Sequence, residues 1–237
     1  MKLLEKALKL TDTALVRYGS LGASALLMLV GAYLALVWSP AAAGETAVYR
    51  IVYFHVPTAI MAYLGFFVTF AGSFLFLWRK DMLFDRVAKI GAELGVVFCG
   101  LMLVTGMIWG KQRWGAWWIW EPRLTTALIL LIIYAGYLML RSTIDNQMTR
   151  ARYAAVFGIV GFLDVPVVHF AIKMWGSIMH PVVIKSMADP GMPPEMINTL
   201  RVCMLAFGVL FAVLFLLRLR VETLALEIAA LRSNHEE

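Results

Sequence analysis

Five of the eight tryptophans in the chain fall within twelve residues: Trp109, Trp114, Trp117, Trp118 and Trp120. Tryptophan commonly anchors helix ends at a membrane interface, but anchoring needs only one or two residues at each end. If the stretch is helical, Trp114, Trp117, Trp118 and Glu121 share one face. Three cations flank that face: Lys111, Arg113 and Arg123. A broad apolar surface edged by cations predicts a site for a flat ligand that carries carboxylates, with plain interfacial anchoring as the alternative.

Three of the four histidines fall where a ligand to iron could be supplied. His55 and His180 are predicted at the membrane face that carries the tryptophans, and two imidazoles from separate elements can ligate one iron from opposite sides. For each histidine alone, a hydrogen-bonded structural role is the alternative. His169 lies deeper and is predicted to support the ligands rather than to bind iron. His235, in the polar tail, is expected to be solvated.

The remaining reactive side chains give no sign of another chemistry. Cys99 and Cys203 lie in separate apolar runs, and no Cys-x-x-Cys pair occurs. A thioredoxin-like redox site and covalent attachment of haem to a cysteine pair are therefore excluded. Glu93 and Asp164 fall inside predicted spans, where a structural role is favoured over proton transfer because no chain of relay residues accompanies them.

The composition identifies the elements that must position these side chains. Of 237 residues, 62% are hydrophobic and 15% are charged, whereas a soluble domain has about 25% charged residues. A chain this apolar is neither a soluble globular domain nor a disordered or collagen-like one, so it predicts a protein that crosses the bilayer several times. The net charge of +6 is expected in loops beside the membrane and not at a nucleic-acid surface.

The hydropathy pattern predicts an all-α integral membrane protein, a six-transmembrane-helix bundle that forms one domain over residues 1–237. Each predicted span has about the 20 apolar residues needed to cross the hydrocarbon core. The spans are 19–38, 55–78, 87–109, 123–140, 154–175 and 197–217. The tryptophan-rich loop 110–122 joins the third and fourth spans.

The distribution of basic residues predicts the orientation. Of the 21 Lys and Arg, 14 fall in the two tails and in the loops after the second and fourth spans. The positive-inside rule places these segments, and both termini, in the cytoplasm. Residues 1–18 are predicted as a cytoplasmic amphipathic segment and 218–237 as a cytoplasmic tail. Signal-peptide cleavage after the alanines 41–43 is disfavoured, because the preceding apolar run is longer than a typical signal sequence.

Several motifs together resemble one known family. The segment Trp-Gly-Ala-Trp-Trp-Ile-Trp-Glu-Pro-Arg at 114–123 is similar to the WWD signature of membrane haem-handling proteins. Its flanks resemble the cytochrome c maturation family CcmC, also called haem exporter protein C. These flanks are Tyr-Arg-Ile-Val-Tyr-Phe-His-Val-Pro at 49–57, Trp-Gly-Lys at 109–111, Arg-Leu-Thr at 123–125 and Pro-Val-Val-His-Phe at 166–170. The similarity runs in matching order from about residue 49 to 181.

The resemblance implies a specific role in the biogenesis of c-type cytochromes. The protein would bind haem b non-covalently and transiently at the periplasmic face of a bacterial inner membrane and deliver it to the haem chaperone CcmE. His55 and His180 match the axial ligands, and 114–123 matches the haem platform. Lys111, Arg113 and Arg123 would contact the haem propionates. Arg50 and His169 would lie beside the two axial ligands. Implied partners are CcmE, CcmD, the CcmA–CcmB ABC transporter and the lipid bilayer, with no nucleic acid.

One residue departs from the family pattern, and two other function classes compete. Glu121 stands where the signature usually has Asp, which is the better helix cap. No nucleophile or general base is evident, so the chain is expected to be a delivery factor and not an enzyme, although positioning could promote covalent attachment of haem to its partner. The alternatives are a b-type membrane redox protein and a polytopic transporter or assembly subunit. The first would need four membrane histidines for two haems, and a secondary transporter is expected to show internal repeats, which are not visible here.

Overall fold

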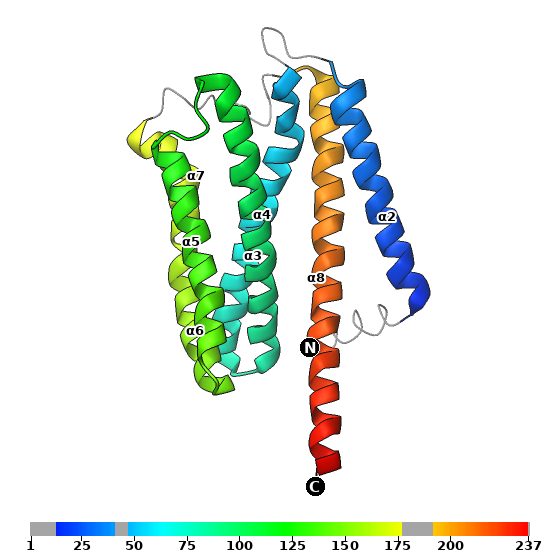
Figure 1. Ribbon diagram of the computed structural model, residues 1–237, viewed down its shortest axis with the longest axis vertical. Helices are drawn as coiled ribbons and strands as arrows, with labels where there is room; N and C mark the ends of the chain where they lie inside the picture. Colours follow the sequence, from blue (N-terminus) through cyan, green and yellow to red (C-terminus); the bar gives the residue numbers. More distant parts are fainter. Residues whose placement is uncertain (1–12, 41–46, 177–191, 237) are drawn as a thin grey trace.

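The computed structural model describes residues 13–40, 47–176 and 192–236 as a bundle of helices, with no strand in these ranges (Figure 1). The elements are α2 (Ala14–Tyr33), η1 (Leu34–Trp38), η2 (Ala47–Ile51), α3 (Val52–Arg79), α4 (Met82–Trp114), α5 (Pro122–Thr143), α6 (Gln147–Phe162), α7 (Asp164–Trp175) and α8 (Pro194–Glu236). Six helical segments are long and apolar enough to cross a membrane. The predicted all-α fold with six spans is therefore confirmed.

Five of the six predicted spans lie inside one helical segment, the fifth extends over α6 and α7, and most helices are longer than the predicted spans. Charged residues at the ends lower the local hydropathy without ending a helix, because polar side chains are well solvated where the helix leaves the hydrocarbon. The predicted amphipathic segment 1–18 stays a prediction, since its residues 1–12 lie outside the described part of the chain and α2 begins at Ala14. The predicted tail 218–237 is the continuation of α8, which remains helical to Glu236.

The helix ends follow local sequence signals. Lys80 adopts a left-handed conformation (φ 58°) and closes α3, and the Asp81 side chain then caps α4 by accepting a hydrogen bond from Leu83 N at 2.8 Å. Asn146 caps α6 in the same way, accepting from Thr149 N at 2.9 Å. These caps make the turns from α3 to α4 and from α5 to α6 short, so that each of these two pairs of helices is an antiparallel neighbour pair.

The predicted fifth span is broken where its proline requires a break. α6 ends at Phe162 and α7 begins at Asp164, with Leu163 N bonded back to Val160 O at 3.1 Å. Pro166 has no N–H to donate to the carbonyl one turn back, so the helical ladder cannot continue through this point. The Asp164 Oδ2 atom beside the break is buried and has no hydrogen-bond partner among the described residues.

Small residues bring α3 and α4 into close contact. A Cβ on Gly65 of α3 would lie only 2.7 Å from the Cα of Gly95 on α4, so neither helix could hold this position with a larger residue. Small residues at an interface let helix backbones approach in a membrane, where no hydrophobic force drives association. The α3–α4 pair is thus the tightest unit of the bundle.

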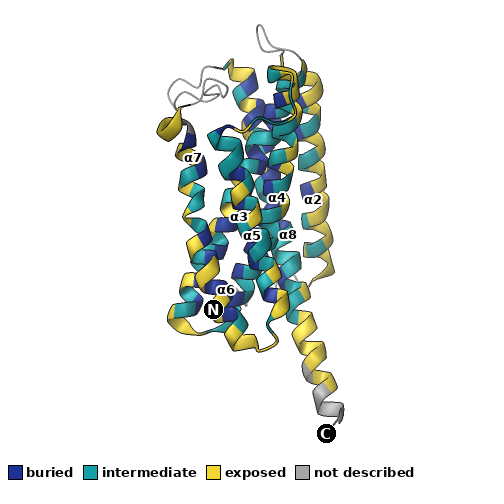
Figure 2. Ribbon diagram, turned by 60° about the vertical axis from the view of Figure 1, so that its left-hand side comes forward, coloured by how far each residue is buried: buried dark blue, intermediate teal, exposed yellow. Residues whose placement is uncertain are grey.

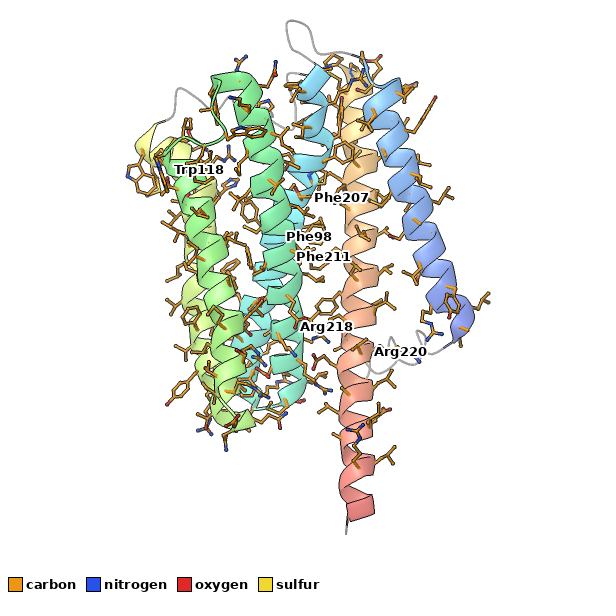
Figure 3. All side chains as sticks on the ribbon, viewed as in Figure 1. Phe98, Trp118, Phe207, Phe211, Arg218 and Arg220 are labelled. Carbon is orange, nitrogen blue, oxygen red and sulfur yellow. The ribbon has the colours of Figure 1, made fainter. Side chains whose placement is uncertain are left out.

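The helices α2 and α8 lie side by side at one flank of the bundle, where α8 packs against α3 and α4 (Figure 1). The ring of Phe98 on α4 meets Phe207 and Phe211 of α8, with centroids 6.4 and 5.9 Å away (Figure 3). The outer faces of the helices are exposed along much of their length (Figure 2). The exposed residues include many large apolar side chains, as lipid contact requires. The first residues of α2 and the last residues of α8 lie at the same end of the bundle, opposite Trp118 (Figures 1 and 3).

Candidate functional site

The end of α4 carries the first two tryptophans of the aromatic segment. α4 extends to Trp114, so the predicted loop 110–122 is shorter and comprises residues 115–121. Gly115 takes a left-handed conformation (φ 76°) that ends the helix, and the Lys111 ammonium donates to the Gly115 carbonyl at 2.8 Å. The ring of Trp114 lies over Gly110 and meets Trp109 edge to face at 5.3 Å. Trp109 and Trp114 therefore form a fixed aromatic pair on the helix.

The loop itself holds the other three tryptophans. Trp118 and Trp120 meet edge to face, with centroids 5.6 Å apart. Trp117 and Trp120 are 54% and 78% exposed, whereas the Nε1 atom of Trp118 is buried and has no hydrogen-bond partner among the described residues. Trp118 lies at the end of the bundle, above α5 and α7 (Figure 3). Residues 115–121 are not helical, so the condition for a common face of Trp114, Trp117, Trp118 and Glu121 is not met. Four of the rings instead form two edge-to-face pairs.

The residues at the end of the loop form the start of α5. Pro122 lies in the first turn of α5, where its missing N–H costs nothing. Glu121 is the N-cap residue, but its side chain makes no capping hydrogen bond and is 8% exposed. Its carboxylate is therefore directed into the protein. It extends one methylene group further from the backbone than the carboxylate of an Asp would. Arg123 follows in the first turn and is half-buried. The position of Arg113 is exposed, at the end of α4.

His55 lies in the first turn of α3 and faces α4. Its Nδ1 atom is 3.0 Å from the hydroxyl oxygen of Thr105. That hydroxyl also lies 2.8 Å from the carbonyl of Leu101 and 3.0 Å from that of Met102, so its hydrogen points back along α4. With its hydrogen on these carbonyls the Thr105 oxygen can accept from His55, and an imidazole that donates from Nδ1 carries its lone pair on Nε2. Nε2 is thus the atom that can ligate a metal.

The residue after Thr105 leaves room for the imidazole. A Cβ on Gly106 would lie 3.2 Å from Cε1 of His55 and 3.7 Å from Nδ1. The ring can therefore approach the α4 backbone because position 106 has no side chain. Neither Thr105 nor Gly106 was found by sequence reasoning. The available signal was a Thr-Gly pair within an otherwise apolar span.

The start of α3 is tied to the end of the first span. Arg50 donates from Nη1 to the carbonyl of Ala35 at 2.9 Å. The hydroxyls of Tyr53 and Ser39, both buried, are also hydrogen-bonded to each other. Arg50 was predicted beside the iron ligands, and its bond to Ala35 gives it a defined role in holding the turn that precedes His55.

The remaining histidines fall elsewhere. His169 is on the exposed side of α7, with its ring edge to face with Phe170 at 4.8 Å. His180 is outside the described residues, so its pairing with His55 stays a prediction. The structure brings together His55, Thr105 and Gly106, and separately Lys111, Gly115 and the tryptophans.

Comparison with known proteins relates this arrangement to one family. Residues 5–234 match the family model described as "Heme exporter protein C". The chain is 33% identical over 207 residues to the Heme exporter protein C of Escherichia coli strain K12, covering 86% of this chain and 82% of the relative. The proteins of the same name from Rhodobacter capsulatus and Paracoccus denitrificans are 32% and 34% identical. These matches cover 90% and 83% of this chain, and 88% and 83% of the two relatives.

Proposed function

Since the chain belongs to the Heme exporter protein C (CcmC) family, we propose that it binds haem b at the tryptophan-loop end of the bundle and delivers it to the chaperone CcmE. Family membership supports a role in haem export and cytochrome c maturation. The haem is cargo that the protein holds for a time and releases. Our proposal is therefore a binding and delivery factor that catalyses no reaction with residues of its own.

The observation that carries the proposal is the geometry of His55. A histidine that ligates a metal usually donates its second ring N–H to a neighbouring oxygen, which fixes both tautomer and ring orientation. The hydroxyl of Thr105 at 3.0 Å supplies that oxygen. Bis-histidine ligation then needs one further imidazole, and we propose His180 for that role.

The other residues of this end fit a haem chemically. Trp117 and Trp120 offer exposed aromatic faces to the macrocycle, and the buried Nε1 of Trp118 offers a hydrogen-bond donor. Arg123, on the first turn of α5, is proposed to meet a propionate, with Arg113 as a second cation. Lys111 already holds the Gly115 carbonyl, so we assign it to the shape of the loop.

We propose that the haem end faces the periplasm of a bacterial inner membrane. The opposite end carries the excess of Lys and Arg that is typical of cytoplasmic loops. Haem held on the outer face would be reached by CcmE, with the exposed rings of Trp117 and Trp120 at the contact. CcmD and the CcmA–CcmB transporter are proposed as further partners, and any ATP hydrolysis would belong to them, because this chain has no phosphate-binding loop motif.

The visible spectrum of the purified protein tests the proposal. Wild type from haem-replete cells should show a Soret band and a sharp reduced α band of the b type. His55→Ala and His180→Ala should each weaken or shift both bands, and His169→Ala, at an exposed position on α7, should leave them unchanged. A folded wild type without haem would refute the proposal and favour a transporter or assembly role. Loss of the bands only in His169→Ala would refute the ligands and leave haem binding intact.

A further inference from the structure

A second polar site lies at the end of the bundle opposite the tryptophans. A partly open cavity of about 230 Å³ is lined there by the beginning of α4, the end of α5, the beginning of α6 and the lower part of α8. Its charged lining comprises Asp85, Arg86, Lys89, Arg141, Arg150 and Glu222. Four cations and two carboxylates thus line one partly open cavity between four helices.

Both carboxylates are already neutralised by neighbours. Asp85 accepts two hydrogen bonds from Arg141, at 2.6 and 2.7 Å, and both side chains are buried. Glu222 accepts from Lys89 at 2.6 Å and lies 2.6 Å from Arg218. These charge-assisted hydrogen bonds occupy the carboxylate oxygens of Asp85 and Glu222. The positive charge of the other two cations that line the cavity is therefore not compensated.

The excess charge belongs to Arg86 and Arg150. Neither residue forms an ion pair within the described part of the chain. The Nε atom of Arg86 is also buried without a hydrogen-bond partner there. A buried guanidinium N–H without a partner is costly, so an anion that accepts from it is strongly favoured.

The position of the cavity relative to the membrane indicates which kind of anion binds there. α5 runs from Pro122 to Thr143, and 22 residues at 1.5 Å each span about 33 Å, slightly more than the hydrocarbon core. Arg141 is in the last turn of α5, and Arg150 is in the first turn of α6. The cavity is therefore at the level of lipid phosphate groups, and Met82 and Leu226 give it an apolar rim.

We propose that this cavity binds the phosphate group of an anionic phospholipid, with Arg86 and Arg150 as its ligands. A cavity of about 230 Å³ is smaller than the roughly 300–1,000 Å³ of sites for drug-sized ligands, and it accommodates a phosphate with part of a glycerol. Basic pockets between membrane helices recognise lipid head groups in this way. The site is independent of the haem end, and it provides a lipid contact that joins α4, α6 and α8.

Retention of phosphatidylglycerol through purification tests this site. The full-length protein is extracted with detergent from vesicles of equal phosphatidylglycerol and phosphatidylcholine, washed in about 1 M salt, and its bound lipid is counted by mass spectrometry. At that salt the Debye length is about 3 Å, so only contacting charges contribute. Arg86→Gln/Arg150→Gln should retain at least tenfold less phosphatidylglycerol, because each basic group next to an anionic membrane contributes a factor of about five.

The matched control removes two cations from the same end without touching the cavity. Arg79 and Arg152 are exposed there, and Arg79→Gln/Arg152→Gln should retain phosphatidylglycerol as wild type does.

Two results would overturn the proposal: equal losses of phosphatidylglycerol in both double variants, or a wild type that retains phosphatidylglycerol no better than phosphatidylcholine. The latter result would favour an acidic segment of a protein partner. Displacement of the lipid by 50 mM inorganic phosphate would overturn the lipid assignment and identify a free-phosphate site. Unchanged melting temperatures in phosphatidylcholine would show that the variants are folded.

Discussion

The hydrogen bond between His55 and Thr105 gives the most direct test of the haem site. Thr105→Val keeps the shape of the side chain and removes the oxygen that accepts from Nδ1, 3.0 Å away. Without that acceptor the imidazole can rotate or carry its proton on Nε2, the atom proposed to ligate iron. Loss of such a supporting contact typically weakens metal binding about 10–100-fold, which corresponds to about 1.4–2.7 kcal/mol.

The assay is titration of the haem-free protein with haem, followed through the Soret band, and transfer of bound haem to an excess of apomyoglobin. We expect Thr105→Val to bind 10–100-fold more weakly and to lose haem correspondingly faster. Thr105→Ser retains the hydroxyl and should bind much as wild type does. The release rate separates a weakened ligand from a misfolded fraction, because misfolded protein lowers occupancy without changing the rate of the remainder.

The matched control is a threonine with the same local bonding and no histidine beside it. Thr223 on α8 donates to the carbonyl of Leu219 at 3.0 Å, as Thr105 does to its own helix. Thr223→Val should leave haem binding unchanged. Haem affinity and spectrum of Thr105→Val equal to those of wild type would refute the role of Thr105, and equal losses in Thr105→Val and Thr105→Ser would point to packing instead of the hydrogen bond.

Two further changes test the tryptophan pair and the opposite end of the bundle. Gly110→Ala puts a methyl group 2.8 Å from the Trp114 ring, so the ring must move and haem occupancy should fall. Gly100→Ala on the same helix meets nothing within 4 Å and should leave occupancy unchanged, as measured by the ratio of haem to protein absorbance. Asp85→Asn leaves the Arg141 guanidinium buried without the charge that compensates it, and should destabilise the protein by roughly 3 kcal/mol. Thermal melting in detergent measures that loss, and an unchanged midpoint would show that the pair contributes nothing.

Most of the fold could be predicted because crossing a membrane imposes a simple pattern. A run of about 20 apolar residues must be helical in lipid, since no other open structure satisfies its backbone hydrogen bonds. All six predicted spans therefore correspond to helices, and the proline in the fifth marks the break between α6 and α7. The helices are longer than the predicted spans, because α2 begins at Ala14 and α8 continues to Glu236. Outside the hydrocarbon, hydropathy no longer decides whether a helix continues.

The candidate site was predictable only as far as residue types reveal chemistry. The cluster of tryptophans and the position of His55 at a helix end are visible in the sequence. The arrangement of the rings is not, because it depends on the left-handed Gly115, which ends α4 and directs the loop away from a helical path. Spacing predicts a shared face only while the helix lasts, and here the helix stops after the second of the five tryptophans.

The contact that orients His55 could not be predicted for a different reason. His55 and Thr105 are fifty residues apart on antiparallel helices, and their register is set by the close approach of Gly65 to Gly95. A single sequence does not show which glycines of two helices meet, so it does not show which polar side chains become neighbours further along. Once the glycines fix the register, the hydroxyl of Thr105 and the open space at Gly106 fall at the imidazole together. The proposed iron ligand is therefore positioned by the packing of the whole α3–α4 pair, and the loop contributes the surface that we propose receives the haem macrocycle.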